Sequence, residues 1–503
     1  MMKHDYPVRL ISLLLVLLTF AASLFSCAPG GEKPSDTLPA TKAEETEARI
    51  TADLPDLDLG GYTFSVYHWV LNGGGVLYND LYAEELDGDP VNEAIFRRNS
   101  RLGEKYHFDI SYTDDEYNVI VQNVRSLVRA GDDVYDLVYI RLNDVQANVL
   151  EGDFLDFETS FRYVDLDKPY WDQSLRETLS FMDHLFLAAS AINTEDKKET
   201  VGMMFNKQIA ADHNMPDFYE LVNKGEWTLD KLFDIVNTFD GDLNGDSVLR
   251  PGDDILPCVS NDFAVMSLFF GAGGHFVTKD KYGVPEYTFN TEENYEITEL
   301  VTDIMTHPNY ASTDTTQFPA DMGGSVGNFE SGESLFLSYA LWAVIEMRGI
   351  DTIDFGVIPH PKYDEAQTDY ISYLSKHGMG FMSVLRCEED TDNVGFIMEA
   401  LAADSYYDLQ DAFYDVTLKT KSARDDESQA MLDLIFSNRV IDFADVYDFS
   451  GFASAYLRQL SNPGFRNKNI TTIYAEYEKK IESTMEDFYE KVEKLDEEIF
   501  MVD

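Results

Sequence analysis

An alternation of strand-like and helix-like segments between residues 62 and 140 constrains the fold of this chain most. Tyr62–Val66 alternates apolar and polar residues, and Ile110–Thr113 is a second short β-prone run. Tyr135–Ile140, with the sequence YDLVYI, predicts a fully buried strand. One helix is expected after Asp89-Pro90, and another is expected to end at Gly131, which suits a C-terminal cap. The order is therefore β-α-β-α-β, which right-handed crossovers make a parallel sheet.

Ligands of such sheets bind beyond the carboxyl ends of the strands. Two segments dense in polar and aromatic groups are expected there. The segment after the first strand contains Tyr67, His68 and Trp69, and the segment after the third strand contains Arg141, Asn143 and Asp144.

A second α/β region begins near Leu185. It continues through a strand-like segment ending at Asn206 and through helices near residues 217–223 and 229–238. Trp227 precedes the second of these helices, where we expect it to pack the helix start. Further helices are predicted at residues 389–403 and 470–494. Two α/β regions with shared connections predict an α/β protein with two lobes.

The N-terminus has the layout of a secretory signal. Lys3 and Arg9 precede a mostly apolar run, Leu10–Leu24, which is shorter than the roughly 20 residues that span a bilayer. Leu24-Phe25-Ser26-Cys27 resembles a lipobox, so residues 1–26 are expected to be removed and Cys27 to carry a lipid. The alternative is an ordinary signal peptide with an incidental cysteine. Residues 27–57, rich in Pro, Gly, Thr and Glu, predict a disordered tether.

Charge restricts the partners of the chain. Its 38 basic and 92 acidic residues give a net charge of −54, which disfavours nucleic acid and anionic solutes. Cys258 and Cys387 lie in apolar or strand-like contexts and are expected to be buried free thiols, with a long-range disulfide as the alternative.

Residues 242–253 carry the spacing of a calcium-binding loop. The expected ligands are the carbonyl of Val248 and the side chains of Asp242, Asn244, Asp246 and Asp253. This register places Leu249 at the usual hydrophobic anchor, whereas a register from Asp240 would place Ser247 there. Because Ser247 replaces the usual glycine and Asp253 a bidentate glutamate, a weak structural Ca²⁺ site is predicted. The alternative is an acidic turn exposed to solvent.

Signatures of catalysis are weak. Residues 323–327 match the nucleophile-elbow pattern around Ser325, but the preceding TTQFPADM is no buried strand. HExxH, phosphate-loop and CxxC patterns do not occur, and the nine histidines lack metal-ligand pairing. We therefore expect no enzymatic activity. A glycoside hydrolase is the enzymatic alternative, since its two carboxylates cannot be recognised among 92 acidic residues.

Aromatic residues interleaved with polar ones favour a carbohydrate ligand. Sugar rings stack their C–H faces on Trp or Tyr, while their hydroxyls need directional polar partners. Besides the two segments named above, Tyr170 with Trp171, and Tyr339 with Trp342, show this interleaving.

Several segments together resemble the family 1 extracellular solute-binding proteins of ABC importers, chiefly those for sugars. They are VDLDKPYWDQ, LFLAASAIN, MMFNK, YELVNKGEWTLDKL, the DLNGD loop, and FESGESLF leading to Trp342 and DFGVIPHPK. The resemblance implies a periplasmic-binding-protein-like (type II) clamshell, with parallel-type sheets flanked by helices and a hinge. It implies that residues 185–193 approach the first crossing, which makes Asn193 a further candidate ligand residue.

The implied lobes are residues 58–190 with about 382–435, and residues 191–381 with about 436–503. The implied role is that of a monomeric lipoprotein on the outer face of a bacterial membrane, which closes around a carbohydrate and delivers it to the membrane subunits of an importer. A peptide or another non-sugar solute bound by the same fold is the alternative.

Overall fold

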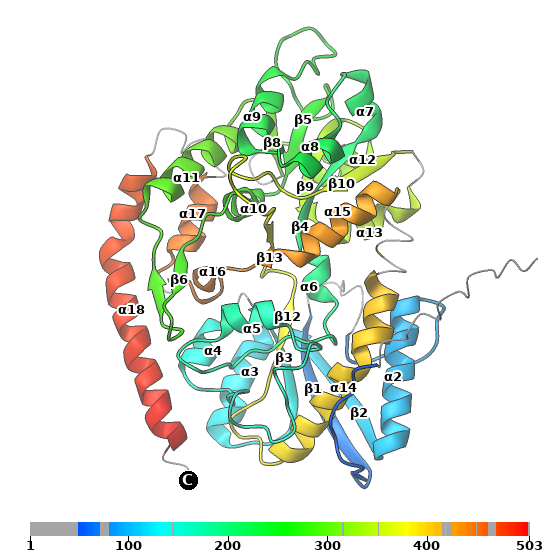
Figure 1. The fold of residues 1–503 in the computed structure, drawn as a ribbon, viewed down its shortest axis with the longest axis vertical. Coiled ribbons are helices and arrows are strands. Elements are labelled where there is room, and N and C mark those ends of the chain that lie inside the picture. Colours follow the sequence, from blue (N-terminus) through cyan, green and yellow to red (C-terminus); the bar gives the residue numbers. More distant parts are fainter. Residues whose placement is uncertain are drawn as a thin grey trace, which may run out of the picture. The chain divides into compact units, whose positions relative to one another are not determined.

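Two mixed β-sheets, both flanked by helices, organise the chain (Figure 1). The computed structural model describes residues 49–70, 80–142, 145–313, 316–350, 352–414, 418, 425–448, 450–460 and 469–500. The predicted signal peptide, the lipidation site Cys27 and most of the tether lie outside the described residues.

The first sheet has the strand order β12-β3-β1-β2. Its strands are β1 (Tyr62–Val70), β2 (Phe108–Glu116), β3 (Leu137–Arg141) and β12 (Gly380–Ser383). β1 pairs in parallel with β2 and β3, and the connections are α2 (Pro90–Tyr106) and α3 (Tyr117–Ala130). The predicted β-α-β-α-β order is confirmed. β12 adds an antiparallel strand from far along the sequence, so this sheet is mixed rather than purely parallel.

Local signals explain why the two connecting helices begin and end where they do. The Asp89 side chain caps α2 by accepting from Val91 N at 2.9 Å, with Pro90 at the first helical position. Gly131 closes α3 with a φ of 67°, a conformation that favours glycine. α2 packs against α14 (Thr391–Asp411), so the sheet and these helices form one layered unit.

β1 is longer than predicted, which corrects the placement of three candidate site residues. The strand runs to Val70, so Tyr67, His68 and Trp69 lie within it rather than after it. β1 is an inner strand, and its aromatic residues pack against neighbours. Tyr67 stacks on Tyr135 at 4.5 Å between ring centroids. Tyr67, His68 and Trp69 therefore lie inside the first sheet, where all three side chains are buried.

The second sheet has the order β10-β4-β9-β5-β8. Its strands are β4 (Val201–Asn206), β5 (Leu256–Ser260), β8 (Tyr310–Ser312), β9 (Ser334–Ala340) and β10 (Phe355–Ile358). β5 is parallel to β8 and β9, whereas β4 is antiparallel to both of its neighbours. The predicted role of Trp227 is confirmed, because its side chain is buried beside the N-cap Thr228 and its Nε1 donates to Pro359 O at 3.0 Å.

The remaining elements flank or connect the two sheets. α15 (Asp426–Ser437) packs against β10, and α18 (Ile470–Phe500) contacts both α11 (Glu292–Met305) and α4 (Gln146–Leu150). Cys258 is buried, Cys387 is half-buried, and both are free thiols. The predicted lobe boundaries stay a prediction. The bounds of these elements are α4 (Gln146–Leu150), α5 (Gln173–Leu179), α6 (Glu195–Lys198), α7 (Lys207–Asp212), α8 (Phe218–Lys224), α9 (Leu229–Thr238), α10 (Ala264–Gly271), β6 (Val277–Lys279), β7 (Pro285–Tyr287), α11 (Glu292–Met305), α12 (Gly324–Glu330), α13 (Trp342–Glu346), β11 (Ser372–Tyr373), α15 (Asp426–Ser437), β13 (Arg439–Val440), α16 (Phe443–Tyr447), α17 (Phe452–Leu460) and α18 (Ile470–Phe500).

Candidate functional site

A guanidinium flanked by two aromatic rings stands at the carboxyl end of β3. Arg141 is the last residue of this strand, and its Cζ lies 3.8 Å from the ring centroid of Tyr117 and 5.9 Å from that of Trp69. Tyr117 is the first residue of α3, directly after β2. The carboxyl ends of three neighbouring strands thus supply one cation–aromatic group, of the kind that stabilises a cation over a ring face.

Trp69 presents a buried N–H group beside this guanidinium. Its side chain is 1% exposed, and its Nε1 has no hydrogen-bond partner among the described residues. Gly380, the first residue of β12, makes this position possible, because a Cβ there would lie 2.4 Å from Trp69 Nε1. The hydroxyl of Tyr139 in β3 is likewise buried and unpartnered within the described chain. Buried donors of this kind are normally satisfied by protein, water or ligand.

The segment that leads from the first sheet to the second packs against the same edge. Asn193 donates from Nδ2 to Gly380 O at 3.3 Å, and Glu195 accepts from Gly380 N at 3.0 Å. Asp80 accepts from Thr194 N at 2.7 Å and also from the Thr194 hydroxyl. Asn193, Arg141 and Trp69 are therefore brought close together around the start of β12.

Buried charges follow in and around α6. Burial raises the pKa of Glu195 well above its ordinary value and raises that of Glu199 to about 7. Burial alone would raise the pKa of Asp196, but the cations Lys197 and Arg439 lower it. Arg439, which pairs with Asp196, also donates to Asp172 at 3.0 Å. The first crossing is thereby tied to α5 and β13 through ion pairs.

Tyr339 and Trp342 form a pair at the end of β9 in the second sheet. Their rings meet edge to face at 5.3 Å, with an interplanar angle of 85°, and both side chains are half-buried. They stay candidate ligand residues.

Other predicted site residues have partners within the protein. Tyr67 donates to Asp115 at 2.8 Å and accepts from Asn123 at 2.7 Å. His68 stacks on Tyr139 at 5.2 Å, and burial lowers its pKa to about 4, so the imidazole is neutral at pH 7. These contacts give both residues a packing role in the first sheet.

Tyr170 and Trp171 lie apart from the Arg141 group and share one buried acceptor. The carboxylate of Glu399 in α14 accepts from the Tyr170 hydroxyl and from Trp171 Nε1, the latter at 2.9 Å. Both side chains are 1% exposed. The remaining candidates, Asn143 and Asp144, lie outside the described residues.

Sequence reasoning missed four residues of this edge. Tyr117, Asp80, Glu195 and Gly380 belong to it through the contacts above, but they come from four separate parts of the chain. Tyr117 could have been found, because it directly follows the second predicted strand. Nothing local marks the other three.

The acidic loop of residues 242–253 satisfies many of its oxygens internally. Asp242 accepts from Gly245 N at 2.6 Å and from Ser247 N at 2.8 Å, and these bonds lower its pKa. Ser247 has a φ of 63°, the left-handed conformation that a glycine usually adopts at this loop position. Arg250 pairs with Asp246 at 2.5 Å, in competition with a metal ion.

The neighbouring carbonyl and the anchor position add to this comparison. Val248 O accepts from Arg250 at 3.3 Å, and Leu249 packs against the core. The Asp253 side chain is exposed to solvent. In the described part of the chain, no group of three or more His, Cys, Asp or Glu side chains is placed to hold a metal ion. The backbone conformation of the loop suits Ca²⁺. Its side chains, by contrast, are not arranged around a metal ion.

The nucleophile-elbow pattern has no catalytic setting. Ser325 lies in α12, is 1% exposed, and accepts a hydrogen bond from Thr313 at 2.8 Å. Within the ranges that the structure covers, no helix is long and apolar enough to cross a membrane.

No family model matches the chain, and no curated protein matches it by sequence. Solved structures do match. A cyclo/maltodextrin-binding protein complexed with maltotetraose has a TM-score of 0.53 at 14% identity, covering 87% of this chain and 98% of that chain. A Streptococcus pneumoniae solute-binding protein in complex with the blood group A-trisaccharide has a TM-score of 0.50 at 14% identity, covering 84% and 98%. This chain has the fold of ABC-transporter solute-binding proteins.

The solute-binding-protein fold confirms the predicted α/β class and, at the level of fold, the resemblance seen in the sequence. It does not determine the ligand. UgpB from Mycobacterium tuberculosis in complex with glycerophosphocholine has a TM-score of 0.50 at 12% identity, covering 85% of this chain and 99% of that chain. The ligand has to be argued from the residues of this chain.

Proposed function

We propose that this chain is the solute-binding component of an ABC importer and that it captures a carbohydrate, an oligosaccharide in particular. The observation that carries the proposal is the aromatic and guanidinium group of Trp69, Arg141 and Tyr117, at the carboxyl edge of a sheet in this fold. Ligands of open α/β sheets bind at such edges.

The chemistry of this edge suits a neutral polyol. Arg141 supplies several N–H donors in a rigid plane, and the unpartnered Trp69 Nε1 adds another. Asp80 and Glu195 supply acceptors nearby, although both already bind backbone N–H groups. An anionic ligand is disfavoured by the net charge of −54 and by the Asp80 carboxylate. A sugar has many hydroxyls, and each needs a hydrogen-bond donor or acceptor with a fixed direction.

Binding is proposed to work by closure of the two α/β regions around the solute, without a reaction. A ligand shifts such an equilibrium only through contacts that differ between the two states. The crossing at residues 193–199, bonded to Asp80, Gly380 and Arg439, lies where such a change would act. The protein is proposed to act as a monomer.

Delivery is proposed to depend on the lipid at Cys27. The tether from residue 27 to 57 would hold the binding protein at the outer face of the cell membrane, which raises its effective concentration near the membrane subunits of the importer. The membrane is thus a partner through the lipid alone.

A structural Ca²⁺ ion in the loop of residues 242–253 is a separate proposal. It is supported by the spacing of the loop and by the left-handed Ser247. Asp242, Asn244, Asp246, Asp253 and the carbonyl of Val248 would hold the ion, once Asp246 exchanges Arg250 for it.

The function is tested by titrating the purified mature chain with a panel of neutral oligosaccharides, while its tryptophan fluorescence is followed and the sugar is analysed afterwards. A saturable change with intact sugar supports the proposal. Released reducing ends would show a glycoside hydrolase. Silence with every glycan, together with a response to peptides or to glycerophosphocholine, would show a non-sugar solute.

A further inference from the structure

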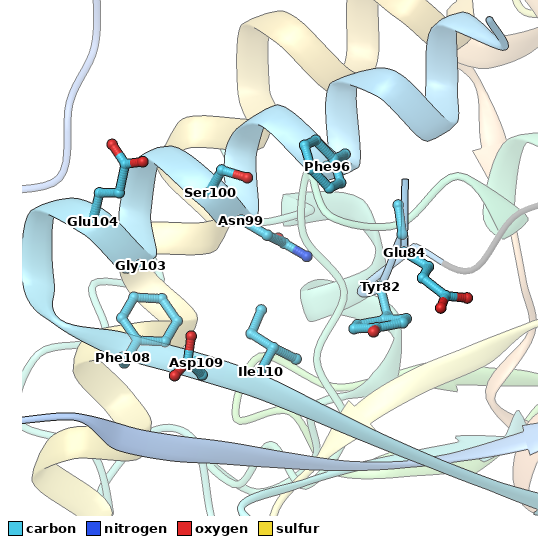
Figure 2. A pocket seen from close by; sticks show the side chains of 11 residues that line it. Tyr82, Glu84, Phe96, Asn99, Ser100, Gly103, Glu104, Phe108, Asp109 and Ile110 are labelled. Carbon is cyan, nitrogen blue, oxygen red and sulfur yellow. The ribbon is translucent and has the colours of Figure 1, made fainter. Parts of the chain in front are cut away.

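A cavity lies on the first sheet, away from the carboxyl edge. It has a volume of about 490 Å³ and is bounded by α2, by the start of β2 and by residues 82–84 (Figure 2). Phe108 at the start of β2 pairs with Tyr62 at the start of β1, whereas Trp69 pairs with Asp115 near the other end. The cavity is therefore separate from the proposed sugar site.

The cavity offers apolar and aromatic surface. The side chains of Tyr82, Phe96 and Ile110 lie around a common space in Figure 2. Tyr82 is 37% exposed, and its ring is held by stacking on Tyr112 at 5.9 Å with an interplanar angle of 12°. A fixed and partly exposed aromatic face can therefore receive a ligand.

The charges around this space are all negative. Glu84, Glu104 and Asp109 line it, and no Lys, Arg or His does. These three carboxylates take part in no ion pair or side-chain hydrogen bond within the described chain.

The cations of α2 do not neutralise the cavity, because each is engaged elsewhere. Arg97 pairs with Glu93 at 2.6 Å, and Arg101 pairs with Asp408 at 2.9 Å. Arg98 donates to Ser405 and to Asp80 O, both at 3.0 Å, and Lys105 donates to the Tyr106 hydroxyl at 2.7 Å.

We propose that this cavity binds a small organic cation, with an ammonium or guanidinium head and an apolar or aromatic body. The head is attracted by the face of Tyr82 and by the negative potential of Glu84, Glu104 and Asp109, which lie on different sides of the cavity (Figure 2), while the body packs on Phe96 and Ile110. The Asn99 amide, which also lines the cavity, is held in place because it donates to Leu81 O at 2.8 Å and accepts from Arg98 Nε at 3.0 Å.

The test is a calorimetric titration of the mature chain with phenethylammonium, with 2-phenylethanol as the neutral comparison. The double variant Glu104→Gln, Asp109→Asn should weaken the cation about tenfold, because an exposed ion pair contributes a factor of about two to five. Tyr82→Leu should weaken it about threefold by removing the aromatic face. Glu85→Gln is the matched control, since Glu85 is an exposed carboxylate outside the cavity, and it should change the affinity less than twofold.

Three results would overturn the proposal. The first is that phenethylammonium binds no more tightly than 2-phenylethanol. The second is that Glu85→Gln weakens binding as much as the double variant, which would mean attraction by the overall charge. The third is that a trilysine peptide binds while phenethylammonium does not, because the cavity would then receive a side chain of another protein.

Discussion

Replacing Glu399 by alanine should destabilise the protein strongly without changing its ligand affinity. The Glu399 side chain is 1% exposed and accepts from the Tyr170 hydroxyl, from Trp171 Nε1 at 2.9 Å and from Asp165 N at 3.2 Å. These hydrogen bonds connect residues 165–171, which precede α5, to α14. Alanine removes the acceptor and leaves the two aromatic donors buried.

The magnitude follows from these two donors. A buried donor left without a partner costs about 1–3 kcal/mol, while Asp165 is exposed, so water can replace the acceptor of its N–H. Two buried donors give a loss of about 4 kcal/mol in the free energy of unfolding, a large share of the typical 5–15 kcal/mol or so. Glu399→Gln keeps one acceptor oxygen, and the expected loss is about 1–2 kcal/mol.

Urea unfolding followed by circular dichroism measures both variants against the native chain. Sugar affinity, measured in parallel, should stay within twofold, since the polar atoms of Tyr170 and Trp171 bind Glu399. The reasoning is refuted if Glu399→Ala costs under about 1 kcal/mol, or if it weakens the ligand tenfold in a fully folded protein. The second result would place Tyr170 and Trp171 at the ligand.

Three further outcomes are expected. Burial raises the pKa of Glu199 from 4.5 to about 7, so the stability that Glu199 contributes is complete below pH 4.5 and is lost as the pH rises through 7. Glu199→Gln should therefore flatten the fall in the free energy of unfolding between about pH 5 and 8. An unchanged slope would argue against this role of Glu199. EDTA should lower the melting temperature by about 3 °C, and Asp242→Asn should abolish that effect; no response and no copurified Ca²⁺ would reject the calcium site. Cys27→Ala should release the protein to the medium with its ligand affinity unchanged, and retention at the membrane would contradict the lipid anchor.

Periodicity and caps predicted the framework because both act locally. The apolar spacing, the Asp89 cap and the Gly131 terminus are properties of a few neighbouring residues, and the structure confirms α2 and α3 from them. The predicted end of β1 at Val66 was wrong, and the reason is also physical. Whether Tyr67 and His68 are exposed depends on Tyr135 and Tyr139, which arrive from another strand.

The candidate site was predictable only where a strand end supplies it. Arg141 was found because it ends β3, and Trp69 because it lies near the end of β1. Gly380 and Asp80 reach the same edge through pairings across 185 and 114 residues, which no local pattern reveals. Glu399 is 228 residues from Trp171, so the sequence could not show that this tryptophan has a partner inside the protein.

The central claim is most directly tested by isothermal titration of the mature chain with the oligosaccharide that responds best in the fluorescence panel, for the native chain, Arg141→Lys and Arg141→Ala. The account predicts one-to-one binding with the sugar recovered intact, and a loss of at least about tenfold for Arg141→Ala, since a hydrogen bond to a charged group contributes about 1.5–3 kcal/mol. Arg141→Lys should fall between the two, because it keeps the charge and loses the planar donor group. Absence of binding to every glycan, or equal affinity in all three chains, would contradict the account.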